Sequence, residues 1–136
     1  MDLQVRNLQT RPVDNQAFER IAERVLALED RRLDVLSLVF VDDERMRETN
    51  LAYRGLDSST DVLSFEAEED EEGLVSGEII IAVPTAERQA QTAGHALEQE
   101  LTWLFAHGLL HVLGYDDETE AGLEAMIARQ REALTP

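Results

Sequence analysis

The sequence predicts a single α/β (α+β) domain over residues 1–136, in which a mixed four-stranded sheet is packed by about five helices. Short apolar segments typical of strands are interspersed with longer amphipathic segments of helical period. Their order along the chain is strand, helix, strand, helix, then two strands and three helices. One segment, residues 33–41, is apolar on both faces, which is typical of a central strand that is covered on both sides. Neither an internal repeat nor a linker rich in Gly, Pro or Ser divides the chain.

The first half supplies two strands and two helices. Residues 3–8 alternate between apolar and polar, as in a short strand. Asp14 can cap a helix whose apolar residues recur at i, i+3, i+4, i+7 and i+8. These residues are Phe18, Ile21, Ala22, Val25 and Leu26. Residues 33–41 (LDVLSLVFV) form the central strand, and a short helix is expected over residues 43–51. Residues 53–61 (YRGLDSSTD) contain too many turn-forming residues to be a regular element.

The second half opens with a predicted hairpin. Val62–Phe65 and Glu78–Val83 are apolar segments that indicate strands, and the second is rich in isoleucine and valine. The residues between them include the acidic run 66–73, which we expect to be the loop that joins the two strands as an antiparallel pair.

Three helices are expected to complete the chain. Pro84 suits the first position of a helix that ends at Gly94. The next helix covers residues 96–113, and Gly114 can stop it in a left-handed conformation. The last helix covers residues 118–134.

Acidic residues strongly outnumber basic ones. The chain has 29 Asp and Glu against 12 basic residues, all of them Arg, for a formal net charge of −17. This balance disfavours a protein that grips nucleic acid through bulk positive charge, but it leaves open a local groove lined by arginines. The chain has no Cys, so a metal must take His, Asp or Glu ligands. No apolar targeting segment or long apolar run is found, so we expect a cytoplasmic protein with no membrane partner.

The residues with the clearest chemistry lie near the end of the helix predicted over residues 96–113. His107 and His111 are four residues apart, so both imidazoles lie on one face of a helix and can reach the same metal ion. A break at Gly114 would fold the chain back and present Asp117 as a third ligand. The same spacing occurs in extended zinc-protease motifs. Gly108, however, stands where those proteases have the glutamate that takes a proton from water, which disfavours a metalloprotease.

Asp117 has a second interpretation. With Glu120 it fits a D-x-x-E capping box at the start of the last helix, in which case it would not be free to bind a metal. Asp116 could provide the cap instead and leave Asp117 available. Two histidines at this spacing often only pack against their neighbours and bind no metal. The prediction of a metal site therefore depends on the whole pattern of histidines, glycine and carboxylate.

Three segments resemble one known family. Residues 107–117 (HGLLHVLGYDD) resemble the signature H-G-x-L-H-L-x-G-Y-D-H of the YbeY family of bacterial endoribonucleases, which are also described as rRNA maturation factors. Residues 53–55 (YRG) and 60–65 (TDVLSF) resemble the family's Y-R-G and T-D-V-L-S-F segments. Residues 77–81 (GEIII) are similar to its G-D-I-x-I strand, and all these segments follow one another in the family's order.

The resemblance implies a zinc-dependent, single-strand-specific endoribonuclease. Its substrate would be ribosomal RNA, especially the 3′ end of small-subunit rRNA, and it would also act in ribosome quality control. The implied partners are single-stranded RNA and the ribosome or its small-subunit proteins, and not DNA. His107 and His111 correspond to metal ligands, with one Zn²⁺ per chain, and Arg54 corresponds to the functional arginine near the metal.

One position departs from the family pattern, because Asp117 stands where the family usually has a third histidine. A carboxylate is also a zinc ligand, but two histidines with one carboxylate suit Fe or Mn too, so another divalent metal is possible.

Two other functions compete with a nuclease: a ribosome assembly factor that acts mainly by binding, and a zinc metalloprotease-like hydrolase. Three ligands leave a coordination position for water or substrate, which favours catalysis. RNA would also need a groove in which Arg54 acts with neighbours. The candidates for that role are Arg6, Arg31, Arg45 and Arg47.

Overall fold

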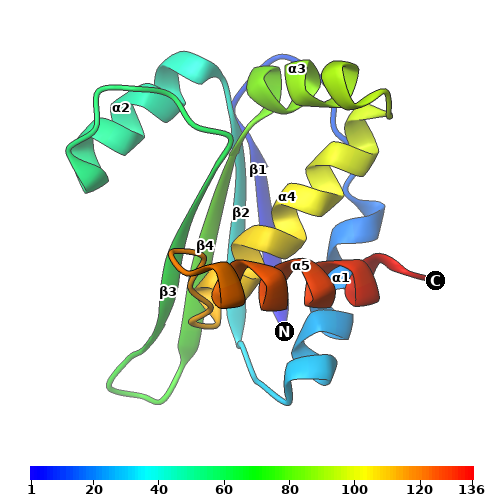
Figure 1. Cartoon of the computed structure of the whole chain (residues 1–136). Coiled ribbons are helices and arrows are strands. Elements are labelled where there is room, and N and C mark those ends of the chain that lie inside the picture. The colour runs from blue at the N-terminus through cyan, green and yellow to red at the C-terminus, as the bar shows by residue number, and fades with distance from the viewer.

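The computed structural model describes residues 1–136 as one four-stranded sheet with five helices around it (Figure 1). The strands are β1 (Asp2–Asn7), β2 (Val35–Val41), β3 (Val62–Glu69) and β4 (Val75–Ala82). The helices are α1 (Gln16–Glu29), α2 (Asp43–Arg54), α3 (Val83–Ala93), α4 (Leu97–Val112) and α5 (Glu120–Leu134). The predicted α/β class and the predicted order of elements are confirmed. None of the five helices is long and apolar enough to cross a membrane.

The sheet has the strand order β1-β2-β4-β3. Strands β1, β2 and β4 are parallel, and β3 pairs antiparallel with β4, as the predicted hairpin requires. In this order β3 is an edge strand, so one side of its backbone has no strand partner. This edge matters for function because the candidate site lies beside it.

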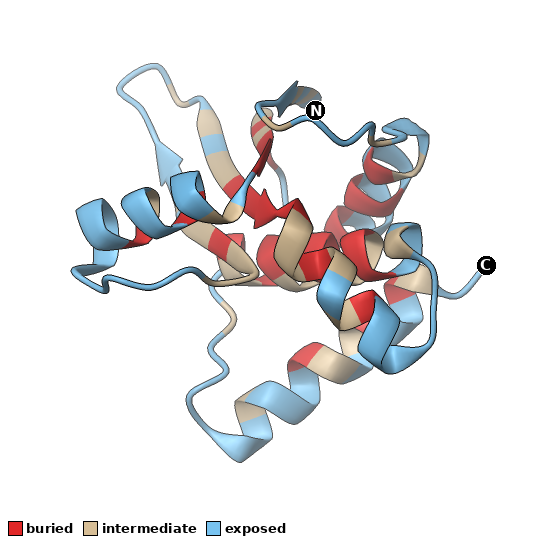
Figure 2. Cartoon of the chain, turned by 90° about the horizontal axis from the view of Figure 1, so that it is seen from above, coloured by how far each residue is buried: buried red, intermediate tan, exposed pale blue.

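The main core lies on the face of the sheet that α1, α4 and α5 cover, where 23 buried residues form one cluster. Helix α4 crosses the middle of this face, and the buried residues in Figure 2 concentrate around it. A smaller cluster of six buried residues lies on the opposite face, partly under α2. Strand β2 contributes Phe40 to the first cluster and Val39 and Val41 to the second, which confirms that it is buried on both faces.

The hairpin differs from the expectation. Glu66, Glu68 and Glu69 belong to β3, and the turn is confined to residues 70–74. Charged side chains are common on edge strands, because they can point to solvent and they discourage pairing with other chains. Asp70 stabilises the turn, since its Oδ1 accepts hydrogen bonds from the amides of Glu72 and Leu74.

Two helix boundaries also differ. Helix α2 continues to Arg54, so Tyr53 and Arg54 lie in its last turn and not in an irregular segment. Gly55, with φ of 69°, provides the left-handed residue that ends the helix. Helix α1 begins at Gln16, and Asp14 contributes by accepting a hydrogen bond from the Gln16 amide at 3.0 Å.

Candidate metal centre

The end of α4 brings the predicted ligands together. His107 and His111 lie one turn apart, with their ring centroids 4.7 Å from each other. The helix then closes with a Schellman turn, in which the amide of Gly114 donates to the carbonyl of His111 and that of Tyr115 donates to Leu110. Gly114 has φ of 99°, a conformation that favours glycine. The turn reverses the chain and places Asp117 beside both imidazoles.

Three ligand atoms converge. The two Nε2 atoms are 3.1 Å apart, and Asp117 Oδ2 lies 3.2 Å from His111 Nε2 and 3.6 Å from His107 Nε2. Ligand atoms of a tetrahedral zinc with bonds of about 2.0–2.1 Å are about 3.3 Å apart. The spacing of the three side chains therefore fits a metal ion of this size.

The hydrogen bonds of the outer ring nitrogens support the same conclusion. His111 Nδ1 lies 2.9 Å from the Tyr115 carbonyl, which can only accept, so Nδ1 carries the proton. His107 Nδ1 lies 3.2 Å from Gln130 Oε1, whose orientation is fixed because the Gln130 amide donates to the Trp103 carbonyl. In the neutral rings both Nε2 atoms are then unprotonated and face a carboxylate oxygen. Three acceptors without a donor suit a cation, and metal-bound histidines are typically oriented in this way.

Asp117 is free for this role because other residues cap α5. Thr119 is the N-cap and accepts a hydrogen bond from the Gly122 amide at 3.0 Å, and Asp116 accepts one from the Glu118 amide at 2.8 Å. The interpretation of Asp117 as a helix cap is therefore wrong.

Gly108 is needed for packing. A Cβ at this position would lie 2.9 Å from both Ile79 Cγ2 and Ser64 Oγ, so glycine allows α4 to lie directly against β3 and β4. A glutamate like that of zinc proteases has no space here. The fold thus gives a steric reason against the metalloprotease alternative, in addition to the missing carboxylate.

A cavity of about 530 Å³ adjoins the three ligands, and we call it the metal cavity. Arg54 lines it from the end of α2, and Thr60–Ser64 line it from the edge strand and the segment before it. Arg54 forms no ion pair, so its guanidinium is available to a substrate. The other arginines considered from the sequence do not line this cavity. Those residues are Arg6, Arg31, Arg45 and Arg47.

Two of these arginines have other partners. Arg31 donates to the Leu113 carbonyl at 3.0 Å, where it supports the end of α4. Arg47 pairs with Asp57 at 2.6 Å, and this pairing raises the pKa of Arg47 and lowers that of Asp57. Of the five arginines considered for a groove from the sequence, only Arg54 lines the metal cavity.

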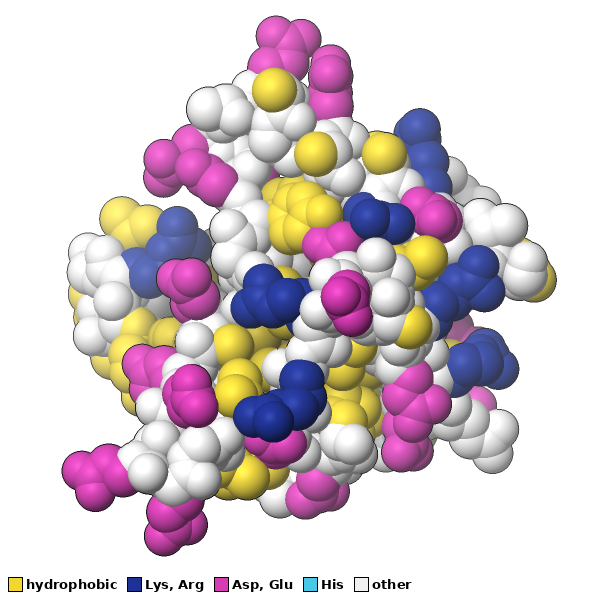
Figure 3. All heavy atoms as spheres, turned by 90° about the horizontal axis from the view of Figure 1, so that it is seen from below, with side chains coloured by type: hydrophobic (Ala, Val, Ile, Leu, Met, Phe, Trp, Pro, Cys, Tyr) yellow, Lys and Arg dark blue, Asp and Glu magenta, His cyan; other side chains and the backbone are white.

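The metal cavity is acidic apart from Arg54. Its lining includes the carboxyl groups of Asp61, Glu66, Asp116 and Asp117. On the face seen from below in Figure 3, charges of both signs are interspersed and no continuous basic patch is present. A phosphate group in this cavity would thus depend on Arg54 and on a bound cation to offset the carboxylates.

A second group of residues holds the turn after α4. Tyr115 interacts with Glu29 of α1 and Arg129 of α5, and hydrogen bonding to Glu29, together with burial, raises the pKa of Tyr115. Arg129 on α5 pairs with the same Glu29 at 2.9 Å. No sequence pattern indicates this network or Gln130, because these residues meet the turn only through tertiary packing.

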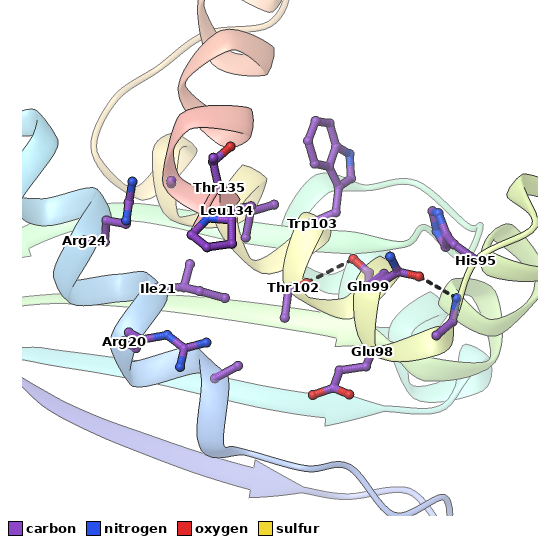
Figure 4. A pocket seen from close by; sticks show the side chains of 14 residues that line it. Arg20, Ile21, Arg24, His95, Glu98, Gln99, Thr102, Trp103, Leu134 and Thr135 are labelled. Atoms are coloured by element: carbon purple, nitrogen blue, oxygen red, sulfur yellow. Dashed lines mark hydrogen bonds between the residues drawn. The ribbon is translucent and has the colours of Figure 1, made fainter.

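A larger cavity lies elsewhere on the molecule. It has a volume of about 860 Å³ and is formed by α1, α4 and the end of α5 (Figure 4). Arg20, Arg24, His95 and Trp103 contribute to its lining, but none of the three candidate ligands does. Arg20 and Arg24, like Arg54, form no ion pair, which makes them useful controls for Arg54.

Comparisons with known proteins agree with the motifs. The family model described as endoribonuclease YbeY matches residues 4–136. The endoribonuclease YbeY of Synechococcus elongatus is 53% identical over 105 residues, which cover 71% of this chain and 59% of that protein. The matched part is thus less than two thirds of that relative's length. The endoribonuclease YbeY of Heliobacterium modesticaldum is 44% identical over 134 residues, which cover 90% of this chain and 79% of the relative.

A solved structure has the same fold. The solution structure of a Thermotoga maritima protein superposes with a TM-score of 0.63 at 26% sequence identity, covering 96% of this chain and 85% of the other. The similarity therefore extends over nearly the whole chain.

Proposed function

This chain belongs to the endoribonuclease YbeY family, and we propose that it is a metal-dependent endoribonuclease acting on single-stranded RNA in ribosomal RNA processing. The proposed enzyme is one domain over residues 1–136. Its metal ligands are His107, His111 and Asp117, and its catalytic residue is Arg54. The observation that carries the proposal is the convergence of three acceptor atoms within 3.1–3.6 Å of one another beside an unpaired arginine.

The ligand set favours a catalytic site over a structural one. Structural zinc sites usually have four protein ligands, whereas three converge here. A metal bound by these three side chains would supply Lewis acidity and make a bound water more acidic. Gln130 and the Tyr115 carbonyl hold the two imidazoles in the tautomer that such binding requires. We propose zinc as the native metal, one per chain, although Fe or Mn would also suit two histidines and a carboxylate.

Arg54 is proposed to bind the scissile phosphate. A guanidinium can donate two parallel hydrogen bonds to phosphate oxygens, and it stabilises the negative charge that develops during cleavage. Arg54, in the last turn of α2, lines the metal cavity and forms no ion pair with the carboxyl groups there. This arrangement lets the arginine and the metal ligands act on one phosphate from different elements.

The proposed biological substrate is ribosomal RNA, with the 3′ end of small-subunit rRNA as the processing site and ribosome quality control as a related role. The ribosome or its small-subunit proteins would then be partners, and the protein would act in the cytoplasm. Membership of the endoribonuclease YbeY family supports these assignments.

Elemental analysis together with an RNA cleavage assay tests the proposal. The purified chain should hold about one divalent metal and cleave single-stranded RNA, and a His107→Ala, His111→Ala variant should lose both properties. His95→Gln is the matched control, because His95 lies in the larger cavity and pairs with Glu100 at 2.7 Å. Unchanged metal content in the double variant would contradict the site. Normal metal content without any RNA cleavage in the parent would favour a factor that acts by binding.

Asp117 is tested separately. Asp117→Asn should fold like the parent, because Thr119 and not Asp117 caps α5, but it should bind the metal more weakly because an amide is an uncharged ligand. Asp117→His should retain the metal, since imidazole is also a ligand. A metal titration that gives equal affinity for Asp117→Asn and the parent would remove Asp117 from the ligand set.

A further inference from the structure

A second, smaller cavity lies on the face of the sheet opposite α4, and we call it the open-face cavity. Its volume is about 380 Å³, within the range of ligand sites. Neighbouring positions on β2, β4 and β3 line it. Among them, Glu78 of β4 pairs with Ser37 of β2 on one side and with Phe65 of β3 on the other. The full lining is Val35, Ser37, Tyr53, Phe65, Glu66, Glu68, Ser76, Gly77 and Glu78.

An exposed aromatic ring stands at the rim of this cavity. Tyr53 is 71% exposed, although tyrosine is a large residue that is usually at least half buried. Its ring contacts Phe65 edge to face, with the centroids 5.1 Å apart, and this contact orients the ring. Much of the aromatic ring therefore remains available to solvent.

The open-face cavity and the metal cavity lie on the two sides of the same edge strand. Ser64 lines the metal cavity, the next residue, Phe65, lines the open-face cavity, and Glu66 contributes to both. Helix α2 shows the same division, since Arg54 lines the metal cavity and Tyr53 lines the other. A flexible polymer that passes the metal ligands can thus continue over the edge of the sheet to Tyr53.

The charges in the open-face cavity indicate which part of an RNA chain it would take. Glu66, Glu68 and Glu78 line it, and no arginine does. Carboxylates repel phosphate, but they accept hydrogen bonds from the N–H groups at the edge of a nucleobase. A base could therefore stack on Tyr53 with its N–H edge toward the carboxylates, while its phosphates stay on the Arg54 side.

We propose that Tyr53 and the open-face cavity form a nucleobase subsite, in which a base next to the scissile phosphate stacks on the Tyr53 ring. This inference rests on the proposed nuclease function and adds to it a positioning residue outside the metal cavity. Stacking of bases on aromatic side chains is a general means of holding single strands, and it tolerates different sequences because every base has a π-face.

The test compares Tyr53 variants of the metal-loaded chain on a short single-stranded RNA that contains 2-aminopurine. Stacking quenches 2-aminopurine fluorescence, so Tyr53→Ala should lose the quenching seen in the first phase of mixing, before cleavage. Its KM should rise roughly 10-fold with kcat nearly unchanged, because the ring holds substrate without touching the reacting atoms. Tyr53→Trp and Tyr53→Phe should retain both the quenching and the parental KM.

Leu51→Ala is the matched control, because Leu51 is an exposed apolar residue of the same helix that does not line the cavity. It should behave like the parent. If the parent binds and cleaves RNA while Tyr53→Ala keeps the parental quenching and KM, the subsite is refuted and the nuclease function stands. If the parent neither binds nor cleaves single-stranded RNA, both proposals fall.

Discussion

Nine of the sixteen residues of α4 are buried, whereas α2 buries only Met46 and Asn50 among its twelve. The two helices supply different parts of the candidate site, since α4 carries the histidines and α2 carries Arg54. Helix α4 crosses the centre of the sheet, while α2 lies to one side of the molecule and is mostly exposed (Figures 1 and 2). The proposed metal ligands are thus placed by the core, and Arg54, which is proposed to bind phosphate, is placed by a helix with few tertiary contacts.

A few polar contacts hold α2 in place. At its start, Asp43 accepts hydrogen bonds from Thr85 and Arg88 of α3, each at 2.7 Å. Burial alone would raise the pKa of Asp43, but these bonds lower it below its usual value. Near the other end, the Asn50 amide donates to the Ser58 carbonyl. The difference between the helices predicts that substitutions around the histidines change folding or metal affinity, whereas substitutions in α2 change cleavage.

The largest effect is expected at Gly108. Gly108→Glu would restore the H-E-x-x-H pattern, but its side chain would collide with Ile79 and Ser64 and bury a charge. We expect the free energy of unfolding to fall by about 3 kcal/mol or more, as measured by urea denaturation. Gln99→Glu adds the same charge to the exposed side of α4 and should change stability little. A stable Gly108→Glu protein would show that α4 is not held as closely as its packing indicates.

In contrast to Gly108→Glu, Arg54→Ala should impair cleavage and leave the fold stable. Loss of the guanidinium should reduce RNA cleavage about 100-fold, as for the loss of one transition-state donor, with little change in Tm or metal content. Arg54→Lys should restore little activity, because an ammonium group cannot form the planar bidentate contact. Arg20→Ala, in the cavity of Figure 4, should cleave normally. Normal cleavage by Arg54→Ala would assign this arginine to the solvated surface.

The sequence predicted the convergence of His107, His111 and Asp117 well because their placement is local. His107 and His111 share a helix face by spacing alone, and the turn at Gly114 needs only a glycine to bring Asp117 back. The hydrophobic pattern of α1 and the two-sided apolar pattern of β2 also follow from local periodicity, and the structure confirms both.

The errors came from boundaries and from long-range packing. The turn-forming residues directly after Tyr53 and Arg54 predict a loop there, although Gly55 is itself a signal for a helix end. The acidic run after Phe65 predicts a loop because glutamate disfavours strands, a preference that exposure at the sheet edge overrides. Gln130, 23 residues beyond His107, is oriented only by the packing of α5 on α4 and had no signal in the sequence.

A substitution of Gln130, the buried residue of α5 that contacts His107, should have an effect of intermediate size. The side chain is fully buried and fixes the tautomer of His107. Gln130→Leu has a similar volume but no acceptor, so metal affinity should fall about 10- to 100-fold in a competitive chelator titration. Gln130→Glu keeps an acceptor for the ring N–H and should retain most of the affinity. Equal affinity for the leucine variant and the parent would show that His107 needs no partner on its outer nitrogen.

Asn50→Ala should have the smallest effect and tests how far α2 depends on polar contacts. Asn50 is 2% exposed, and its amide holds the segment after Gly55 through a 2.8 Å hydrogen bond to the Ser58 carbonyl. Its Oδ1 has no partner, so the substitution removes one hydrogen bond and also one unsatisfied acceptor. The cost to stability should therefore be about 1 kcal/mol. Because Arg54 lies between Asn50 and this segment, cleavage should fall several-fold while metal content stays constant.

Thr49→Ala, which removes an exposed hydrogen bond within the same helix, should leave cleavage unchanged. If Asn50→Ala cleaves like the parent, the position of Arg54 is set by the helix backbone alone, and the contrast between α2 and α4 concerns stability and not the geometry of the site.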